Sequence, residues 1–521
     1  MIPQAAIDAF IKAPRGDHRW LKSLTHKQLD SALASLRPPP RINTTLRFHQ
    51  KLGFLLGTAY PQFCFWYDMG TGKTVLALEL LRYWWDCGRL RRALVFVTSD
   101  KAFPTWEKQL KTWNIDLPSI SLSAGSSVLK WKALEDFKEG LIFITYPGAV
   151  AMTSIRVKSK KGKNKMHLDP KLVKKLAHNV DAIVMDESTR VAWESLTSQL
   201  CARIRRQAKF CYALAGRPFG RDPSMLWRQF FIVDGGQTLG ETLGLFRAAF
   251  FSESENPWAT YAKDYTFKKR MMPELMKIVQ HRSLSYAAEE CIDVPDFQSI
   301  IEEVSLPEEA SAYYQKVIDQ IIAAQGNLEL MKNAFLRMRQ LSSGFLGFRN
   351  DESGERVEIA FDENPKLDRL LELIEAMPDD QGAVIFYSFT TSGRRITKEL
   401  EALGHKVLWL WSGTKDAQGA LRKFQDDSKQ RIAVIQERVG AYSLDGLQDK
   451  ASYLYFYESP ISAIDRSQAE KRVVRQGQKH KVFMYDLIVK GTLDKRILDF
   501  HAQGEELLKA LRADPRKLLE G

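Results

Sequence analysis

The chain has 521 residues, enough for two or three domains that each bury a core. Its hydrophobic fraction of 45% is ordinary for a globular protein, and its net charge of +13 favours a polyanionic partner over a merely basic surface. The sequence shows no secretory signal, no run near the roughly 18 apolar residues that span a membrane, and no cysteines at metal-ligand spacing, which favours a cytoplasmic protein with reduced thiols.

The first segment, residues 1–43, reads as short helices that end near three consecutive prolines, Pro38 to Pro40. Such a run cannot continue a helix and marks a boundary. We therefore expect residues 1–43 to be an accessory helical segment.

Two α/β units are predicted after this segment. Over residues 44–250, continuous apolar runs such as Ala93–Thr98 alternate with helical patterns, and the alternation resumes over 361–500. Continuous apolar runs between helices predict parallel sheets that are covered on both faces. Residues 251–360 carry longer helical stretches without a clear strand series, which predicts a helical insert, and residues 501–521 are expected to form a terminal helix or tail.

A glycine-containing loop follows the strand-like run that ends at Tyr67. It reads DMGTGKT over 68–74, and its glycines would let backbone N–H groups curl around an anion at a helix start. Lys73 would reach the outer phosphates of a nucleotide, and the Thr74 hydroxyl would ligate magnesium. The full phosphate-loop pattern has glycine where this chain has Tyr67. The alternative interpretation is a glycine turn before an ordinary helix.

Two adjacent carboxylates end another strand-like run, Ala182–Asp186. Asp186 would hold magnesium, directly or through water, and Glu187 would polarise the attacking water as a general base. By itself such a pair can be a solvated strand end. Because it follows the phosphate loop within the same α/β unit, it favours nucleotide hydrolysis.

Two arginines in the second α/β unit are the third chemical feature. Residues 464–475 read as a helix, on which Arg472 and Arg475 would share one face. Aimed at a nucleotide held by another domain, they would act as arginine fingers, an effect worth roughly 10³–10⁵ in rate. The alternative is a basic surface helix that binds nucleic-acid phosphates.

The features, in this order, resemble the Swi/Snf-like branch of the superfamily-two helicases and translocases, in the form of its small phage or prophage members. The resemblance covers about residues 44 to 500. The segments that carry it are LRFHQ at 46–50, DMGTGKT at 68–74, ITY at 144–146, DEST at 186–189, LAGRPF at 214–219, RQLSSGF at 339–345, FYS at 386–388, DGLQ at 445–448 and the stretch 468–478.

This resemblance implies two RecA-like parallel-sheet lobes with a helical insert, and an enzyme that hydrolyses ATP with Mg²⁺ while it tracks along double-stranded DNA. The first lobe would supply Lys73, Thr74, Asp186 and Glu187, and the second Arg472 and Arg475. The residues implied to contact ATP are Arg47, Gln50, Met69, Gly70, Thr71, Gly72, Lys73, Thr74, Asp445 and Gln468. Those implied to contact nucleic acid are Thr98, Trp106, Tyr146 and Ser388.

A basic stretch adds a further candidate for nucleic-acid contact. Between Arg156 and Lys175, nine Lys or Arg face one acid, Asp169. A loop containing Lys158, Lys160 and Lys161 could follow a phosphate backbone and make binding depend on salt. The alternative is a solvated loop.

One departure from the family pattern bears on function. In the segment 214–219, the usual Gly-Thr-Pro of the family is Gly216-Arg217-Pro218 here, so the threonine hydroxyl is missing. This motivates one alternative function, an ATP-gated DNA-binding clamp with little turnover. A second alternative is a strand-separating helicase on branched DNA or RNA, which would share every catalytic residue. The chain is consistent with a monomer in a bacterial or phage-infected cell.

Overall fold

The computed structural model describes residues 2–13, 15–16, 18–123, 125–158, 164–216, 218–219, 223–255, 263–291, 296–323, 328–349, 356–437, 439, 446–475 and 477–503. The chain divides into two compact units, unit 1 over Met1–Ile292 and unit 2 over Asp293–Gly521. Each unit is built around its own parallel sheet, so the predicted α/β class with two parallel-sheet lobes is confirmed.

Unit 1 contains a seven-stranded sheet in which every neighbouring pair is parallel. In spatial order its strands are β11 (Ser283–Tyr286), β1 (Gln62–Tyr67), β8 (Phe210–Ala215), β7 (Val180–Met185), β2 (Arg92–Val97), β4 (Gly140–Thr145) and β3 (Ser119–Ser121). The apolar runs of the first predicted unit are strands of this sheet.

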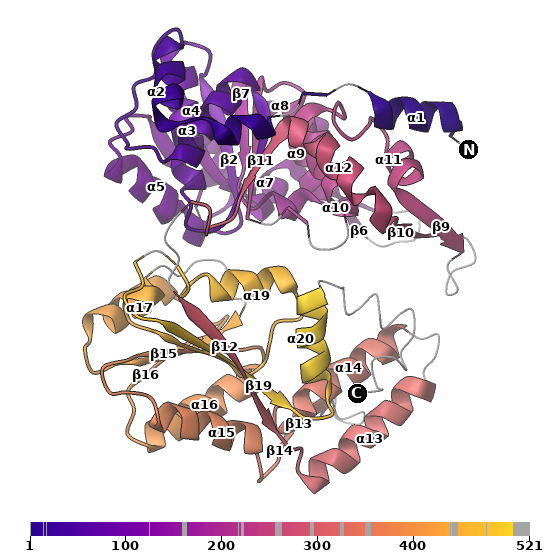
Figure 1. Cartoon of the computed structure of the whole chain (residues 1–521), viewed down its shortest axis with the longest axis vertical. Coiled ribbons are helices and arrows are strands. Elements are labelled where there is room, and N and C mark those ends of the chain that lie inside the picture. Colours follow the sequence, from indigo (N-terminus) through magenta and orange to yellow (C-terminus); the bar gives the residue numbers. More distant parts are fainter. Residues whose placement is uncertain are drawn as a thin grey trace. The chain divides into compact units, whose positions relative to one another are not determined.

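Helices cover both faces of the unit 1 sheet because both faces of its strands are apolar (Figure 1). On β1, Phe63, Phe65 and Tyr67 enter one core and Cys64 and Trp66 the other. The first core is covered by α2 (His26–Ser35), α3 (Phe48–Ala59), α4 (Lys73–Asp86) and α5 (Phe103–Thr112). The second is covered by α1 (Gln4–Lys12), α6 (Ser127–Asp136), α7 (Tyr146–Thr153), α8 (Pro170–Leu176), α9 (Leu196–Arg205), α10 (Ser224–Asp234), α11 (Leu243–Phe250) and α12 (Met272–Val279).

Smaller elements complete unit 1. Two antiparallel ribbons are formed by β5 (Ser154–Lys158) with β6 (Asn164–Leu168), and by β9 (Phe251–Glu255) with β10 (Lys263–Phe267). Short 3-10 helices are η1 (Arg19–Ser23), η2 (Asp100–Ala102), η3 (Ser188–Val191), η4 (Lys269–Met271) and η5 (Gln280–Arg282). The N-terminal segment is part of this unit's packing, since Ile7 and Leu29 lie in its two cores.

Unit 2 contains a six-stranded parallel sheet. In spatial order its strands are β12 (Phe297–Val304), β19 (Val482–Val489), β18 (Tyr453–Phe456), β15 (Ala383–Tyr387), β17 (Ile432–Gln436) and β16 (Val407–Leu410). Helices α15 (Pro365–Glu375) and α16 (Thr390–Ala402) pack on one face, and α17 (Ala417–Asp426) and α19 (Ala463–Glu470) on the other.

A separate helical cluster lies beside this sheet in unit 2. It joins α13 (Glu308–Ala323), α14 (Leu328–Leu341) and α20 (Leu493–Gln503) through one apolar core. The ribbon of β13 (Phe345–Arg349) and β14 (Arg356–Ala360) follows α14, and η6 (Leu447–Asp449) precedes β18. Most of the expected tail, residues 504–521, lies outside the described residues.

Residues 251–360, expected to form a helical insert or connector, contain strands as well as helices. Strand β11 pairs with β1 in unit 1, β12 pairs with β19 in unit 2, and the boundary between the units falls between them. Both are edge strands, which pair on one side only and can carry polar residues. Their sequences, SLSY and FQSIIEEV, therefore lack the continuous apolar run that identifies a central strand.

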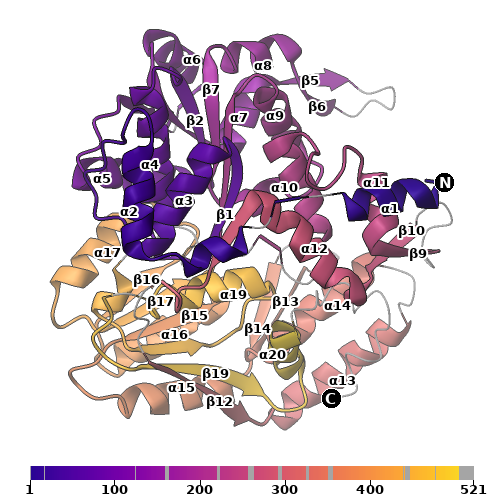
Figure 2. The same cartoon turned by 45° about the horizontal axis from the view of Figure 1, so that its top comes forward.

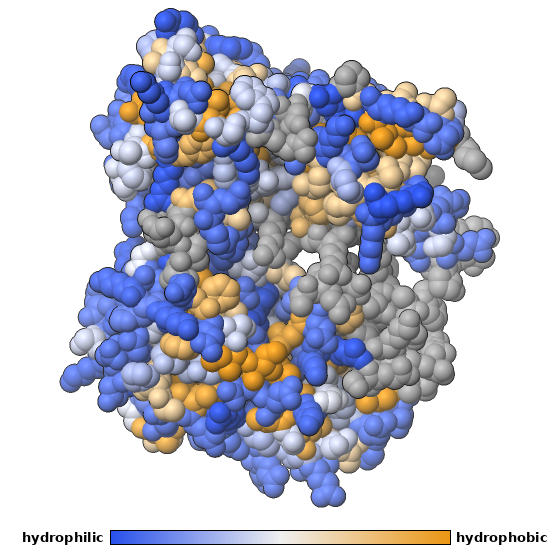
Figure 3. Space-filling model, viewed as in Figure 1, coloured by the Kyte–Doolittle hydropathy of each residue, from blue (hydrophilic) through white to orange (hydrophobic). Residues whose placement is uncertain are grey.

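No helix in the described part of the chain combines the length and apolarity needed to cross a bilayer. Figure 3 shows hydrophilic residues over most of the face that the view presents in each unit, with small apolar patches between them.

Candidate active site

The phosphate loop connects the end of β1 to the start of α4 at the carboxyl edge of the unit 1 sheet. Gly70 and Gly72 have φ of 80° and 88°, in the left-handed region that favours glycine. A Cβ at Gly72 would lie 2.2 Å from Nε2 of Gln50, so a side chain there would displace Gln50 from the loop. Lys73 and Thr74 are the first residues of α4, whose N-terminal N–H groups and dipole favour an anion.

The Lys73 ammonium folds back over this loop. Its Nζ donates hydrogen bonds to the backbone oxygens of Tyr67 at 2.6 Å and Asp68 at 3.2 Å. The side chain stays partly exposed, so a nucleotide phosphate could compete for the same donors.

The start of α3 lies against the phosphate loop. Gln50 donates from Nε2 to the oxygen of Gly72 at 3.3 Å and accepts from the backbone N of Arg47 at 2.9 Å. The neighbouring His49 ring nitrogen Nε2 lies 2.7 Å from the oxygen of Thr71. Gln50, which the family resemblance implies to contact ATP, therefore lies next to the loop implied to hold phosphate.

Tyr67, which replaces the first glycine of the pattern, connects the phosphate loop to α3. Its hydroxyl donates to the oxygen of His49 at 2.8 Å, and its side chain is fully buried. A Cβ at Gly53 of α3 would lie 2.4 Å from the Tyr67 hydroxyl, so Gly53 provides the space for the ring. The only signal of Gly53 in the sequence is a glycine inside a helical pattern.

The carboxylates follow the end of β7. Asp186 accepts from the Trp106 indole Nε1 at 3.2 Å and from the backbone N of Glu187 at 3.1 Å, and its own backbone oxygen accepts from the Tyr146 hydroxyl at 2.9 Å. Glu187 has a φ of 50°, which is uncommon for a residue other than glycine and typical of functional sites.

Trp106 and Tyr146 were expected to contact nucleic acid, and the structure contradicts this for their side chains. They are only 1% and 3% exposed, and both hold Asp186 in place. The reason is that these aromatic rings pack in the cores beneath the carboxyl edge, where their polar atoms need a partner. Thr98, just after β2, remains partly exposed at this edge.

The pKa of Asp186 connects the carboxylate with the phosphate loop. This pKa is raised to about 6, chiefly by burial and then by the charge of Glu187, while the charge of Lys73 and the hydrogen bond from Trp106 lower it. The ammonium of Lys73 is therefore near enough to stabilise the ionised carboxylate. A cation, a hydroxyl and an ionisable carboxylate at one sheet edge fit a magnesium-bound nucleotide, with Thr74 and Asp186 as the residues that would hold the metal.

Hydrolysis should depend on pH through this group. A magnesium ligand must be ionised, so we expect kcat/KM for ATP to fall about tenfold per pH unit below the pKa of about 6, and to be level above it. Raising the magnesium concentration should move the midpoint to lower pH, because the cation stabilises the carboxylate. A pH profile at two magnesium concentrations checks this, and a midpoint that does not respond to magnesium would contradict it.

A buried glutamine joins the loop that carries the carboxylates to the segment 214–219. Ser188, directly after Glu187, donates from Oγ to Oε1 of Gln229 at 2.7 Å. Gln229 in turn donates from Nε2 to the oxygens of Pro218 at 2.7 Å and Met225 at 3.0 Å. Ser188 and Gln229 are 0% and 2% exposed. No local sequence pattern singles out Gln229, because it lies 41 residues from Ser188.

Replacing Gln229 by leucine should destabilise unit 1. The Ser188 hydroxyl and the Pro218 oxygen would lose a buried partner, at a cost of roughly 1–3 kcal/mol in the free energy of unfolding. Urea unfolding would measure this loss. Gln207→Leu, which changes an exposed glutamine of the same unit, serves as the matched control and should change the free energy little. Equal effects of the two changes would contradict the assigned contacts.

In unit 2, the predicted helix over 464–475 is shorter than expected. Helix α19 ends at Glu470, and the backbone N of Arg472 then bonds to the oxygen of Ala469 in a turn. The expectation that Arg472 and Arg475 share one helix face is therefore wrong. Val473, which is fully buried between them, anchors the turn, and both arginines are partly exposed. Gln468, on α19 itself, is 9% exposed.

Ser388 follows β15 and belongs to a charged network of unit 2. Its hydroxyl donates to Glu437 at 2.8 Å and accepts from Arg339 at 3.0 Å, while its backbone N donates to Glu458 at 2.7 Å. Burial raises the pKa of Glu437, and the charge of Arg339 opposes this. The Ser388 hydroxyl is thus engaged by one carboxyl group and one guanidinium group.

Several predicted residues cannot be placed. Asp445, Lys160, Lys161 and Arg217 lie outside the described residues, and Lys158 is described in its backbone only. Met69 is partly exposed and Gly70 exposed in the phosphate loop, with the Thr71 hydroxyl donating to the oxygen of Asp68 at 2.7 Å.

Comparison with known proteins supplies relatives over almost the whole chain, although no family model matches it. It is 23% identical over 497 residues to the putative ATP-dependent helicase/translocase YwqA of Bacillus subtilis, covering 92% of this chain and 50% of that protein. It is 21% identical over 462 residues to the putative protein p41 of Acyrthosiphon pisum secondary endosymbiont phage 1, covering 83% and 90% of the two chains. The chain thus spans about half the length of the Bacillus relative and most of the phage relative.

Among solved structures, the Sulfolobus solfataricus SWI2/SNF2 ATPase core in complex with double-stranded DNA aligns with 92% of this chain and 97% of its own, at 20% identity and a TM-score of 0.40. Over most of its length the chain is therefore similar to proteins named as ATP-dependent helicases or translocases, and its ordered motifs resemble those of the Swi/Snf-like branch of superfamily two.

Proposed function

We propose that the chain is a DNA-stimulated ATPase that translocates along double-stranded DNA. The observation that supports it most is the meeting of Lys73 and Asp186 at one sheet edge, where the charge of Lys73 lowers the pKa of the carboxyl. A phosphate-loop lysine and a metal-binding carboxylate are the two parts that a nucleotide hydrolase must bring together.

Each residue has a separate role in this proposal. Lys73 neutralises charge on the outer phosphates, while Thr74 and Asp186 hold magnesium, which supplies further positive charge when bound. Glu187 accepts a proton from the attacking water. Trp106 and Tyr146 orient Asp186 through the hydrogen bonds described above. Arg472 and Arg475 of unit 2 stabilise the charge that develops on the γ-phosphate.

Double-stranded DNA is the proposed track. The net charge of +13 favours a polyanionic partner, and the family resemblance implies duplex DNA rather than single strands. The Bacillus relative is itself named a helicase/translocase, which fits a motor more closely than a passive clamp.

A comparison of nucleic acids tests the proposal. We expect duplex DNA to stimulate ATP hydrolysis at least about tenfold more than single-stranded DNA or RNA, and the protein to displace a triplex-forming strand from duplex DNA while ATP is consumed. Stimulation mainly by single strands or RNA, with strand separation, would favour the helicase alternative. ATP-dependent DNA affinity without sustained turnover would favour the clamp. Lys73→Ala provides the inactive control.

A further inference from the structure

A pocket of about 650 Å³ lies between α6 and α8 in unit 1, away from the candidate active site. Arg92, which lines it, is the first residue of β2 and pairs with Gly140 and Val180, the first residues of β4 and β7. The pocket is therefore at the amino edge of the sheet. Asp186 follows the other end of β7, so the two places are roughly 17 Å or more apart along a six-residue strand.

The lining of this basic pocket carries five cationic side chains and one carboxylate. The carboxylate, Glu135, is paired with Lys175 at 2.6 Å, and the Lys175 ammonium also lies 4.7 Å from the centre of the Trp131 ring. The Arg92 guanidinium donates to the backbone oxygens of Lys138 at 2.9 Å and Leu134 at 3.1 Å, where it caps the end of α6. Two of the five cations thus have structural partners.

The other three cations are Lys138, Lys171 and Lys174. All are exposed, and within the described ranges none of them forms an ion pair with a carboxylate. Lys171 and Lys174 are three residues apart on α8, so their side chains are neighbours on one face of that helix, and Lys138 approaches them from the end of α6. Three unneutralised ammonium groups that line one concave surface favour a ligand with several negative charges.

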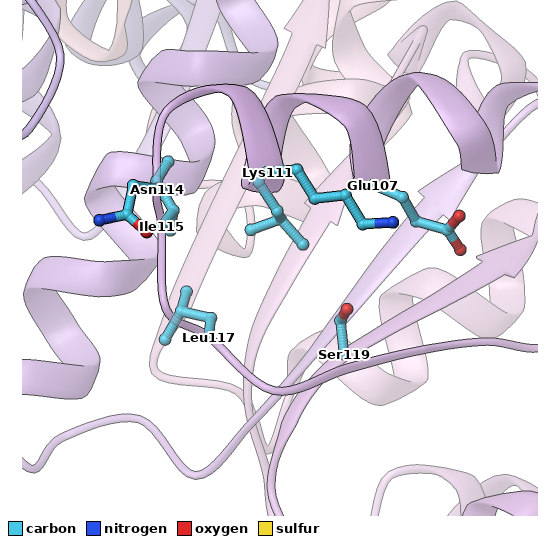
Figure 4. A pocket seen from close by; sticks show the side chains of 7 residues that line it. Glu107, Lys111, Asn114, Ile115, Leu117 and Ser119 are labelled. Atoms are coloured by element: carbon cyan, nitrogen blue, oxygen red, sulfur yellow. The ribbon is translucent and has the colours of Figure 1, made fainter.

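A second pocket of unit 1 does not share this charge. It has a volume of about 440 Å³ and lies between α5 and β3. Its charged lining residues are Glu107 and Lys111, one of each sign, which lie along α5 in Figure 4. That pocket has no net charge to attract a polyanion.

The basic surface continues from the pocket into the β5–β6 ribbon, which leads directly into α8. Cross-strand neighbours on the ribbon combine an apolar and a basic side chain, Arg156 with Met166 and Val157 with Lys165, and all four are exposed. The ribbon strands contain no acidic residue. Figure 2 shows the ribbon projecting beyond the helices around it. A projecting basic ribbon beside a basic pocket suits an extended polyanion better than a small one.

We propose that the basic pocket is a second nucleic-acid contact, which binds the phosphodiester backbone at the amino edge of the unit 1 sheet through Lys138, Lys171 and Lys174. This inference rests on the proposed function only for the class of ligand. It extends the nucleic-acid footprint of the chain to a surface on the opposite edge of the sheet from the nucleotide. The contact adds affinity and salt dependence without acting on the chemical step.

The test compares two triple variants with the unchanged chain. The first is Lys138→Ala, Lys171→Ala and Lys174→Ala. The matched control is Lys12→Ala, Lys27→Ala and Lys277→Ala, which removes the same charge from exposed helix positions of the same unit. Fluorescence anisotropy with duplex and single-stranded DNA of equal length is measured over a range of salt concentrations, together with ATP hydrolysis in the absence of nucleic acid.

We expect the pocket variant to lose at least about tenfold in DNA affinity near 0.1 M salt, and the slope of log K against log salt to become shallower by about 2 to 3 for duplex DNA. The control should keep the slope of the unchanged chain, and all three proteins should hydrolyse ATP equally without nucleic acid. A larger slope change with single strands than with duplex would assign the contact to single-stranded nucleic acid.

Equal slopes for the pocket and control variants would overturn the inference, even if duplex DNA stimulates the ATPase as proposed. Conversely, the pocket variant could show a shallower slope while DNA fails to stimulate the ATPase of the unchanged chain. That result would support the contact and exclude the translocase function. Circular dichroism melting of both variants checks that the folded state is unaffected. A pocket variant that melts earlier is replaced by the milder change Lys171→Gln with Lys174→Gln, which removes two charges and should still make the slope shallower by about 1 to 2.

Discussion

Lys73→Ala should reduce ATP hydrolysis by roughly 10³-fold or more, because the ammonium that neutralises the outer phosphates is removed from a site where fixed charge supplies most of the rate. The variant should also show a higher Asp186 pKa, since the charge of Lys73 lowers that pKa in the unchanged chain. A phosphate-release assay with saturating duplex DNA measures the first effect, and the pH profile of the residual activity measures the second.

Lys27→Ala is the matched control for this prediction, because Lys27 is exposed on α2. It should hydrolyse ATP normally. If Lys73→Ala kept more than about a tenth of the activity, the phosphate loop would not be the site of hydrolysis.

Glu187→Gln should separate binding from hydrolysis. The amide cannot accept the proton of the attacking water, so we expect kcat to fall roughly 10²–10⁴-fold while ATP binding is retained. The loss of the Glu187 charge should also lower the pKa of Asp186 below about 6, because that charge raises it. Single-turnover kinetics with labelled ATP measure the loss of hydrolysis, and equilibrium ATP binding measures the retained affinity. The pH profile of the residual activity measures the pKa.

Glu194→Gln is a suitable control, since this exposed carboxylate follows the same loop and pairs with Arg228 on the surface. Normal turnover by Glu187→Gln would exclude Glu187 as the general base. Loss of ATP binding together with turnover would instead indicate a damaged loop, and the left-handed backbone of Glu187 makes that outcome informative.

The unusual Tyr67 has a structural explanation. Its buried hydroxyl bonds to the backbone of α3, and the ring occupies the space that Gly53 leaves open. A glycine at position 67 would leave this space empty. The phosphate loop therefore keeps its shape through a contact with α3, in addition to its own glycines.

Much of the candidate site follows from local patterns in the sequence. The apolar runs identified the central strands, because a strand that is buried on both faces must be apolar throughout. Gly70, Gly72, Lys73 and Asp186 were found because their spacing and their position after a strand are properties of short segments. For the same reason, the weaker patterns of the edge strands β11 and β12 were missed.

The sequence by itself determined the parallel α/β class, the phosphate loop and the carboxylate pair, since each depends on backbone geometry and hydrophobicity within a few consecutive residues. Only the tertiary structure decided which residues support them. Trp106 reaches Asp186 across 80 residues, Gln229 reaches Ser188 across 41, and Lys138 lines one pocket with Lys171 and Lys174. Such contacts depend on how helices and strands pack, and packing between distant segments leaves no periodic signal in a single chain.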